Sequence, residues 1–322
     1  MSAAPLFEIR NLSIDSERAG IRRRIVQDVN LRVDPGQIYG LVGESGSGKS
    51  VSMMASVGLA AAGLVVQQGE VAFNGARRSA GDQPALRRNL SHGISLLFQN
   101  AKGSLSPFLT TGAQVARVLE RQSMPRQERQ ARIDELFRVV GLSHVDLGRK
   151  YPHQISGGQA QRVAMACALA TDPKLLIADE PTTALDVTTE REMLRFLKRL
   201  CEERGLAIVL IAHNLSLVSE YCSGLSILHA GQVVEEGDLG AIFEAPLHPY
   251  TQGLIAAVPD VDEPHELVPI AGSVWGGRDD VDRCRFSHRC PHAMPRCDAG
   301  LPPSIAIHGR RVHCVLYDEV VR

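Results

Sequence analysis

A glycine-rich run carries the clearest chemistry in the sequence. Residues 43–50 read Gly-Glu-Ser-Gly-Ser-Gly-Lys-Ser, fit the pattern G-x-x-x-x-G-K-S/T, and follow an apolar run at 38–42 that predicts a buried strand. The backbone N–H groups of such a turn point inward at phosphate oxygens, and the dipole of the next helix adds positive potential there. The pattern therefore predicts a phosphate-binding loop rather than a glycine-rich turn without a ligand.

Two side chains of this loop have separate tasks. Lys49 would reach the β- and γ-phosphates of a nucleotide, and the hydroxyl of Ser50 would bind Mg²⁺, a hard ion that prefers oxygen ligands. We expect ATP to be contacted by the whole run and the residue after it, namely Gly43, Glu44, Ser45, Gly46, Ser47, Gly48, Lys49, Ser50 and Val51.

Two adjacent carboxylates end another apolar run far along the chain. Residues 175–178 predict a central parallel strand, and Asp179 and Glu180 follow at its carboxyl end, where α/β sheets bind ligands. We expect Asp179 to be a Mg²⁺ partner. Because side chains alternate along a strand, Glu180 should point elsewhere and polarise the attacking water. A surface acidic pair is the alternative, and the phosphate loop favours the catalytic interpretation.

Between these motifs lies the segment Ile-Ser-Gly-Gly-Gln at residues 155–159. Its small residues let backbone come close to a γ-phosphate, and the apolar helical stretch at 163–170 supplies an N-terminal dipole aimed at the same charge. The segment therefore predicts a second phosphate clamp.

The surrounding patterns predict the elements that must position these residues. Strand patterns near Leu175, Ile208 and Leu225 alternate with helical patterns, which indicates a parallel-sheet core. Residues 69–75 predict a strand and turn of an antiparallel subdomain. Apolar positions recur at helical spacing within about 104–153, which predicts a subdomain of amphipathic helices.

Composition narrows the classes of function. The chain has 322 residues, of which 44% are apolar and 22% charged, and its formal net charge of −1 gives no electrostatic case for nucleic acid binding. We see no secretion signal, and the apolar stretch at 57–66 is short against the roughly 20 residues that span a bilayer. We therefore expect a cytoplasmic protein, peripheral at the cytoplasmic face of the inner or plasma membrane if other subunits supply the spanning helices.

The order of the motifs resembles that of the nucleotide-binding subunits of ATP-binding cassette (ABC) transporters, over almost the whole chain. The phosphate loop, Gln99, the segment 156–159, the Asp179-Glu180 pair, Ala184-Leu185-Asp186 and His213 come in the family's order. The resemblance implies that Gln99 contacts Mg²⁺ and the attacking water, and that His213 contacts the γ-phosphate. The implied catalytic residues are Lys49, Gln99, Glu180 and His213, and the implied Mg²⁺ ligands are Ser50, Gln99 and Asp179.

The resemblance also implies an assembly. In this family the segment that corresponds to residues 156–159, the signature, serves the nucleotide held by the opposite subunit. The residues expected to face the partner's ATP are Ser156, Gly157, Gly158, Gln159 and Asp186. The implied partners are a second ABC ATPase, paralogous or identical, two transmembrane permease subunits and, indirectly, a solute-binding protein. The implied fold is an α/β P-loop ATPase (residues 1–244) with a RecA-like parallel core, an antiparallel β subdomain and a helical subdomain, followed by a cysteine-rich extension (residues 245–322).

The extension narrows the subfamily. Residues 245–251 (Ala-Pro-Leu-His-Pro-Tyr-Thr) resemble the His-Pro-Tyr element of dipeptide and oligopeptide importer ATPases, although two prolines around a histidine mostly fix a turn and have no chemistry of their own. The resemblance implies that ATP hydrolysis drives di- or oligopeptide import. Import of nickel, a metal chelate or another small solute is the alternative, and a soluble ABC ATPase outside transport is the alternative from another class.

Four cysteines follow this element, spaced Cys-x5-Cys-x6-Cys-x16-Cys. In a reducing cytoplasm clustered cysteines are better metal ligands than disulfide partners, but this spacing matches neither the common zinc pattern nor the ferredoxin patterns. The resemblance implies a [4Fe–4S] cluster with a structural role, and zinc is the runner-up. The expected ligands are Cys284, Cys290, Cys297 and Cys314, with His288, His292 and His313 as possible substitutes.

One feature departs from the family's pattern. No aromatic residue lies between Phe7 and Tyr39, so the ring that usually stacks on adenine is missing from its expected place. Ile21 or Ile25 would have to offer an apolar surface instead.

Overall fold

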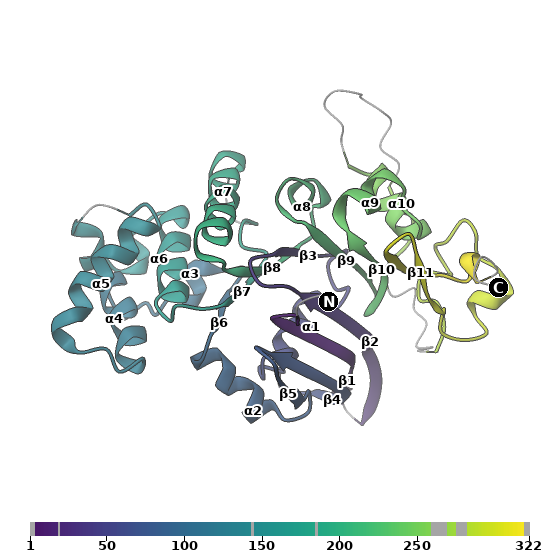
Figure 1. Cartoon of the computed structure of the whole chain (residues 1–322), viewed down its shortest axis with the longest axis horizontal. Helices are drawn as coiled ribbons and strands as arrows, with labels where there is room; N and C mark the ends of the chain where they lie inside the picture. The colour runs from purple at the N-terminus through teal and green to yellow at the C-terminus, as the bar shows by residue number, and fades with distance from the viewer. Residues whose placement is uncertain are drawn as a thin grey trace. The chain divides into compact units, whose positions relative to one another are not determined.

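The computed structural model describes residues 4–18, 20–142, 145–183, 186–258, 269–274 and 282–318. Contacts divide the chain into two compact units, whose elements are labelled in Figure 1. The first unit comprises Met1–Asp34, Ile38–Leu86 and Leu210–Arg322, and the second comprises Pro35–Gln37 and Arg87–Val209. Strand β8 (Ala207–Ala212) begins in the second unit and ends in the first.

The first unit contains an antiparallel sheet with the strand order β2-β1-β4-β5. Its strands are β1 (Phe7–Arg18), β2 (Ile21–Val33), β4 (Leu64–Phe73) and β5 (Ala76–Ser79). Strand β4 ends at Phe73 and turns through Asn74 and Gly75 into β5, so the strand and turn predicted at residues 69–75 are confirmed.

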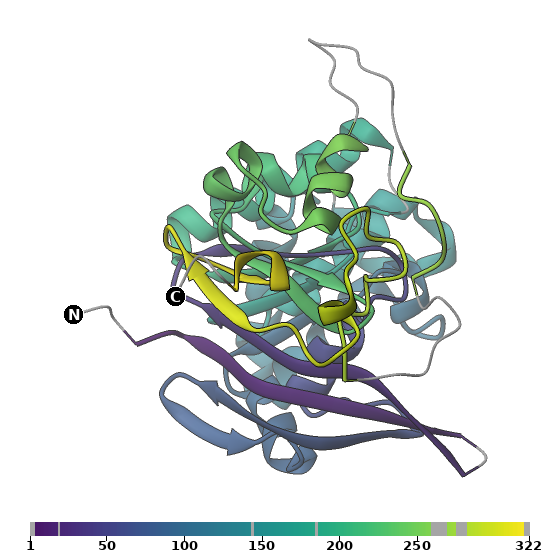
Figure 2. The ribbon, with the colours of Figure 1, turned by 90° about the vertical axis from the view of Figure 1, so that its right-hand side faces the viewer.

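A second group of strands in this unit runs in the order β11-β12-β10-β9-β3. The strands are β3 (Ile38–Val42), β9 (Gly224–His229), β10 (Gln232–Asp238), β11 (Ser304–Ile307) and β12 (Arg310–His313). The pair β3–β9 is parallel, and the others are antiparallel. The C-terminal strands, yellow in Figure 2, therefore extend this sheet beyond β10.

Helices of the first unit connect and cover these strands. They are α1 (Lys49–Ser56), α2 (Gln83–Arg87), α8 (Leu215–Tyr221), α9 (Leu239–Glu244) and α10 (Pro249–Ala256). Helix α1 contacts β1 and β2, and α8 contacts β3 and α9. Helix α1 follows β3 directly through the glycine-rich loop, as the strand-loop-helix prediction requires.

The second unit combines a parallel strand pair with a group of helices. Strand β6 (Ile94–Leu97) pairs in parallel with β7 (Leu175–Asp179), which agrees with the predicted parallel core. The helices are α3 (Ala101–Ser104), α4 (Thr111–Arg121), α5 (Arg126–Val139), α6 (Gly157–Leu169) and α7 (Val187–Arg204). Helix α6 contacts α3, α4 and α5, so the amphipathic helices predicted within 104–153 pack around it.

Short 3-10 helices complete the two units: Arg88–Ser91, Val145–Arg149, Pro152–Gln154, Pro295–Cys297 and Val315–Tyr317. In the parts of the chain that the structure describes, no helix is long and apolar enough to cross a membrane.

Candidate active site

The glycine-rich loop between β3 and α1 has a backbone that requires its glycines. Gly43 has a φ of +157°, and a Cβ there would lie 2.1 Å from the carbonyl oxygen of Leu228. Gly48 caps α1 in the left-handed region with a φ of +99°. Because other residues rarely adopt these conformations, and because the β9 backbone leaves no room at Gly43, the sequence pattern is also a geometric requirement.

Lys49 lies inside this loop with its ammonium group turned onto loop carbonyls. Its Nζ donates to the carbonyl oxygens of Gly43 at 2.7 Å and Glu44 at 3.0 Å, and the residue is only 4% exposed. Ser47 accepts a backbone hydrogen bond from Gly231 at 2.7 Å, which ties the loop to the β9–β10 turn. The buried cation is thus held where phosphate oxygens can take the place of the carbonyls.

The acidic pair is placed as predicted at the end of a buried strand, but for Glu180 the geometric reason differs. Asp179 is the last residue of β7, and Glu180 lies just beyond it with a φ of +44°. The backbone therefore leaves the strand conformation at Glu180, so strand alternation does not set the direction of its side chain. Such a conformation is costly for a residue with a side chain and tends to occur at functional sites.

Within the second unit, Gln99 and Glu180 are brought together. Gln99 donates from Nε2 to a carboxylate oxygen of Glu180 at 2.8 Å, and Thr183 donates to the same oxygen at 3.1 Å. Gln99 follows β6 closely and Glu180 follows β7, so the parallel pairing of these strands carries both side chains to one edge. The Gln99–Glu180 hydrogen bond is a contact that the sequence did not predict.

Residues 156–159 form the start of helix α6, which begins at Gly157, earlier than the stretch at 163–170 predicted as helical. Ser156 is the N-cap: its hydroxyl accepts from the Gln159 N–H at 3.2 Å, and the Gln159 side chain accepts from the Ser156 N–H at 3.1 Å. A Cβ on Gly157 would meet no atom within 4 Å. The helix N-terminus is therefore open, and its dipole acts at the segment itself.

The remaining predicted residues lie at helix and strand ends. Asp186 is the N-cap of α7, accepting from the Thr189 N–H at 3.0 Å and hydroxyl at 2.8 Å, and these hydrogen bonds lower the pKa of its carboxyl. His213 directly follows β8, and Ser50 and Val51 open α1 after Lys49. Ala184 and Leu185 lie outside the described residues. The first unit thus carries the loop and His213, and the second carries Gln99, the acidic pair and residues 156–159.

The two isoleucines named as substitutes for an adenine-stacking ring differ in exposure. Ile21 opens β2 with 60% of its surface exposed, whereas Ile25 is half-buried. Nearby, Arg24 pairs with Asp15 and donates to Gln27 at 3.2 Å. Ile21 is therefore the better-exposed apolar surface of the two.

Four cysteines of the C-terminal extension converge. Cys284, Cys297 and Cys314 are buried and Cys290 partly so, and each of the four thiols interacts electrostatically with the other three. Backbone N–H groups of Phe286, His292 and Leu316 each hydrogen-bond to the cysteine two residues earlier. Burial raises the pKa of Cys284 to about 12 and that of Cys314 to about 11.

These thiols fit a thiolate-bound group in donor chemistry and convergence but not in final geometry. Soft sulfur ligands with N–H···S bonds suit iron–sulfur clusters and zinc. However, among the described residues no group of three or more His, Cys, Asp or Glu side chains is arranged to hold one ion.

Two residues near the phosphate loop have no counterpart among the sequence predictions. Tyr250, in the His-Pro-Tyr element, reaches Glu44 with its hydroxyl, and Arg289 forms an ion pair with the Glu44 carboxylate at 2.6 Å. No local pattern could have found either contact. The only signal was the element itself, which predicts a turn and not a loop contact.

Comparisons with known proteins agree with this arrangement. A family model described as "ABC transporter" matches residues 26–183, and one described as "Oligopeptide/dipeptide transporter, C-terminal region" matches residues 234–297. The oligopeptide transport ATP-binding protein AppD of Bacillus subtilis is 38% identical over 98% of this chain and 97% of its own length. The dipeptide transport ATP-binding protein DppD of Escherichia coli is 39% identical over 96% of both chains.

Solved structures show the same fold. A dimeric, post-hydrolysis structure of the ATP-binding cassette MJ0796 with bound ADP and Pi matches with a TM-score of 0.64 and 29% identity, over 72% of this chain and 98% of that one. The glycine loop, the Gln99–Glu180 pair and the capped α6 define an ABC ATPase. The chain belongs to the ATP-binding subunits of ABC transporters of the dipeptide and oligopeptide importer type.

Proposed function

We propose that the chain hydrolyses MgATP and thereby energises import of di- or oligopeptides through a membrane transporter. The observation that carries the substrate class is the presence, in one chain, of the ATPase region and the oligopeptide/dipeptide transporter C-terminal region, together with peptide-import relatives that match it along nearly their full length. The proposed ATPase domain is residues 1–244, with a helical subdomain at about 104–153, and residues 245–322 are the extension. The protein acts peripherally at the cytoplasmic face of the membrane.

In the proposed chemistry, the phosphate loop binds the phosphates of ATP, and the second unit supplies the groups that activate the attacking water. Lys49 leaves the Gly43 and Glu44 carbonyls for the β- and γ-phosphates, while loop N–H groups donate hydrogen bonds to the remaining phosphate oxygens. Glu180 accepts a proton from the attacking water, and Gln99, bonded to it at 2.8 Å, orients carboxylate and water together. His213 contacts the γ-phosphate.

Mg²⁺ would be held by the Ser50 hydroxyl, the Gln99 amide oxygen and the Asp179 carboxylate. Oxygen donors of this kind suit this hard ion. When bound, the ion neutralises charge on the β- and γ-phosphates. The polypeptide contributes orientation through the N-terminus of α1 and through the end of β7.

We propose that the chain works as a dimer with a second ABC ATPase, either a paralogue or a copy. Ser156 and Gly157 are exposed, and the N-terminus of α6 is open for a phosphate that the chain's own loop need not hold. The matching cassette with ADP and Pi is itself dimeric. Ser156, Gly157, Gly158, Gln159 and Asp186 therefore face the partner's nucleotide.

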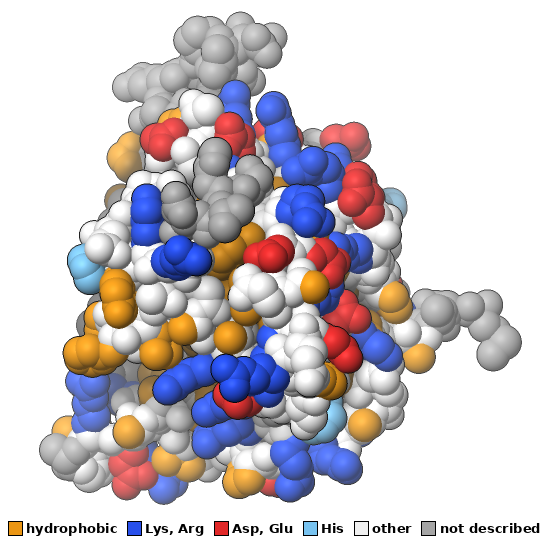
Figure 3. Space-filling view, turned by 90° about the vertical axis from the view of Figure 1, so that its left-hand side faces the viewer, with side chains coloured by type: hydrophobic (Ala, Val, Ile, Leu, Met, Phe, Trp, Pro, Cys, Tyr) orange, Lys and Arg blue, Asp and Glu red, His pale blue; other side chains and the backbone are white. Residues whose placement is uncertain are grey.

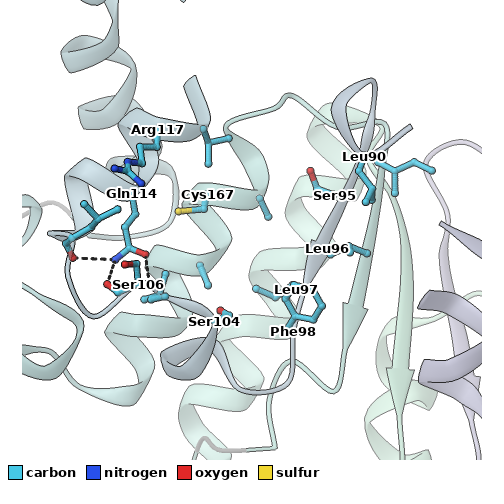
Figure 4. A pocket seen from close by; sticks show the side chains of 16 residues that line it. Leu90, Ser95, Leu96, Leu97, Phe98, Ser104, Ser106, Gln114, Arg117 and Cys167 are labelled. Carbon is cyan, nitrogen blue, oxygen red and sulfur yellow. Dashed lines mark hydrogen bonds between the residues drawn. The ribbon is translucent and has the colours of Figure 1, made fainter. Parts of the chain in front are cut away.

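An apolar groove of the second unit is the proposed contact with a permease subunit. It has a volume of about 430 Å³ and is lined by β6, the loop after it, and helices α3, α4 and α6 (Figure 4). Gln114 ties its floor by hydrogen bonds to Ser106 and Leu109, and Arg117 is the charged residue among the described lining. Figure 3 shows Lys and Arg side chains among hydrophobic ones on the side where Figure 1 draws α4 and α5.

This lining defines what would dock there. Apolar walls with one cation suit a short helix that presents hydrophobic side chains and either a carboxylate or its C-terminal carbonyls to Arg117. Phe98, at the end of the groove, is 43% exposed and lies next to Gln99. Movement of such a helix would therefore act one residue away from the amide that orients Glu180.

For the four cysteines we propose a [4Fe–4S] cluster with a structural role, and zinc remains the alternative. Support comes from convergence of four thiols and from the three N–H···S bonds. Anaerobically purified protein should contain iron and acid-labile sulfide, both of which fall in Cys290→Ser, whereas Cys201→Ser in the ATPase part keeps them. Finding zinc without acid-labile sulfide would contradict the iron–sulfur assignment and support a zinc site at the same cysteines.

Transport is tested in cells that lack this gene. Wild-type chain should restore uptake of labelled di- and tripeptides, and Lys49→Ala should not, because the loop loses the cation that binds phosphate. The matched control Lys198→Ala, on α7, should restore uptake fully. Unchanged peptide uptake in the deletion strain, or loss only of nickel or metal-chelate uptake, would contradict the peptide assignment.

A further inference from the structure

The phosphate loop contains a carboxylate that the C-terminal extension neutralises. Glu44 is the second residue of the loop, and its two oxygens accept from Arg289 NH1 at 2.6 Å and NH2 at 2.9 Å. The Arg289 side chain is 1% exposed and that of Glu44 is 31% exposed. A forked, buried arginine holding a carboxylate in this way is among the stronger and more directional ion pairs in proteins.

Every N–H of Arg289 has an acceptor. Besides Glu44, NH1 donates to His229 Nε2 at 3.1 Å, NH2 to the Ile270 carbonyl at 3.1 Å, and Nε to the Ala271 carbonyl at 2.8 Å. Since the guanidinium has five N–H groups, the set is complete. Apart from Glu44, the head group is therefore held by two carbonyls of the extension and by His229 of β9. Glu44 is the loop residue that pairs with it.

A second residue of the extension holds the Glu44 backbone. The Glu44 N–H donates to the Tyr250 hydroxyl at 3.1 Å, and that hydroxyl lies 3.3 Å from a Glu44 carboxylate oxygen. The backbone carbonyl of Glu44 accepts from Lys49 Nζ at 3.0 Å. Glu44 therefore contacts both parts: its N–H and side chain bind residues of the extension, and its carbonyl accepts from Lys49, the lysine that binds phosphate.

The charge of Glu44 makes this contact matter for nucleotide. A carboxylate in a loop that binds polyphosphate repels the ligand, and the repulsion is strong where water is partly excluded. Arg289 cancels that charge and holds both carboxylate oxygens on the extension, while Lys49 donates to the Glu44 backbone carbonyl.

We propose that Arg289, with Tyr250, is a positioning residue for nucleotide: it neutralises and fixes Glu44, so that ATP affinity of the phosphate loop depends on the C-terminal extension. Arg289 lies between Cys284 and Cys290 in a run of turns closed by backbone bonds, such as Arg289 N–H to Phe286 at 2.9 Å. The segment that carries the cysteines therefore also carries the contact to the loop. This inference rests on the assignment of residues 43–50 as the nucleotide loop.

The test is ATP affinity of the full-length protein, measured by displacement of trinitrophenyl-ATP. Arg289→Ala should raise the ATP Kd about tenfold, equivalent to about 1.4 kcal/mol, because Glu44 is left uncompensated. Glu44→Gln added to Arg289→Ala should return Kd to within about threefold of wild type, because the repelling charge is gone. Arg289→Lys, which keeps charge but loses the fork, should fall between, and Tyr250→Phe should raise Kd about threefold.

Arg310→Ala is the matched control. Arg310 is equally buried in the extension and bonds to the Ala241 and Ala245 carbonyls, but it does not contact the loop. It should lower the melting temperature as Arg289→Ala does while leaving the ATP Kd unchanged. An ATP Kd within about twofold of wild type in Arg289→Ala, or no recovery on adding Glu44→Gln, would overturn the inference. Absence of ATP binding by the wild type would instead refute the loop assignment.

Discussion

Glu180 combines a strained backbone with a functional contact. Its φ of +44° lies in a region that costs a side-chain-bearing residue on the order of 1 kcal/mol, and its carboxylate accepts from Gln99 and Thr183. The left-handed backbone at Glu180 accompanies the contact with Gln99 and Thr183. The sequence predicted the residue's role, and the turn provides its direction.

Replacing Glu180 by Gln should remove the base and keep the shape. We expect ATP turnover to fall at least about 100-fold, the usual worth of a positioned general base, with ATP affinity retained. Phosphate release and nucleotide titration on the same preparation measure both. Glu192→Gln is the control, since Glu192 pairs with Arg162 on the surface of α7 and should leave turnover unchanged. Full turnover in Glu180→Gln would assign the base elsewhere.

The start of α6 is the element in which helix capping coincides with the proposed binding of the partner's phosphate. Ser156 and Gln159 satisfy each other's N–H groups, while the glycines between them leave the helix end open. Apolar periodicity placed the helix at 163–170, because Gly-Gly-Gln carries no hydrophobic signal. The capping box determined the true start.

A substitution at this cap separates the two tasks. Ser156→Asp preserves a good N-cap, so the melting temperature should stay near that of wild type, whereas its charge should repel the partner's phosphate and lower turnover more than Ser156→Ala does. Turnover of the assembled dimer and thermal unfolding are the measurements. Thr110→Asp, at the N-cap of α4, is the control and should change neither. Wild-type turnover in Ser156→Asp would argue against the clamp.

The His-Pro-Tyr element shows the same contrast between local and distant contacts. The sequence predicted a turn here, and the structure starts helix α10 instead: His248 caps it by accepting from the Tyr250 N–H at 3.0 Å, with Pro249 in the first turn. The Leu247 and His248 N–H groups bind the buried carboxylate of Glu235. This local structure also places the Tyr250 hydroxyl against Glu44 of the phosphate loop, a contact that the local sequence does not predict.

At the scale of the whole molecule, buried histidines make stability depend on pH. Burial lowers the pKa of both His229 and His248 to about 3. Charged or titratable groups add to this, namely Arg289, His288 and Arg285 for His229, and His229 and His313 for His248. In the unfolded chain each would titrate near 6.5. Between pH 6.5 and about 3 the unfolded state therefore binds more protons than the folded state. The stability that is present above pH 6.5 is lost as the pH falls.

We expect the free energy of unfolding to drop by as much as about 1.4 kcal/mol per pH unit for each histidine well below pH 6.5. Denaturant unfolding at about pH 7.5, about 6.0 and about 5.0 measures how the free energy of unfolding changes with pH. His248→Asn keeps an N-cap side chain and should give a shallower slope, whereas the control His153→Asn, an exposed position, should leave it unchanged. Equal slopes in all three proteins would contradict the linkage.

The sequence by itself determined the loop, the acidic pair, the signature and the strand-helix alternation, because each depends on neighbours within a few residues. The tertiary structure alone decided which carboxylate Gln99 meets, that Glu180 turns into the left-handed region, and that Glu44 is neutralised by Arg289, 245 residues away. Pairing across such a separation depends on how the extension packs onto β9 and β10. No periodicity, cap or turn pattern encodes that packing, since the partners share no local segment.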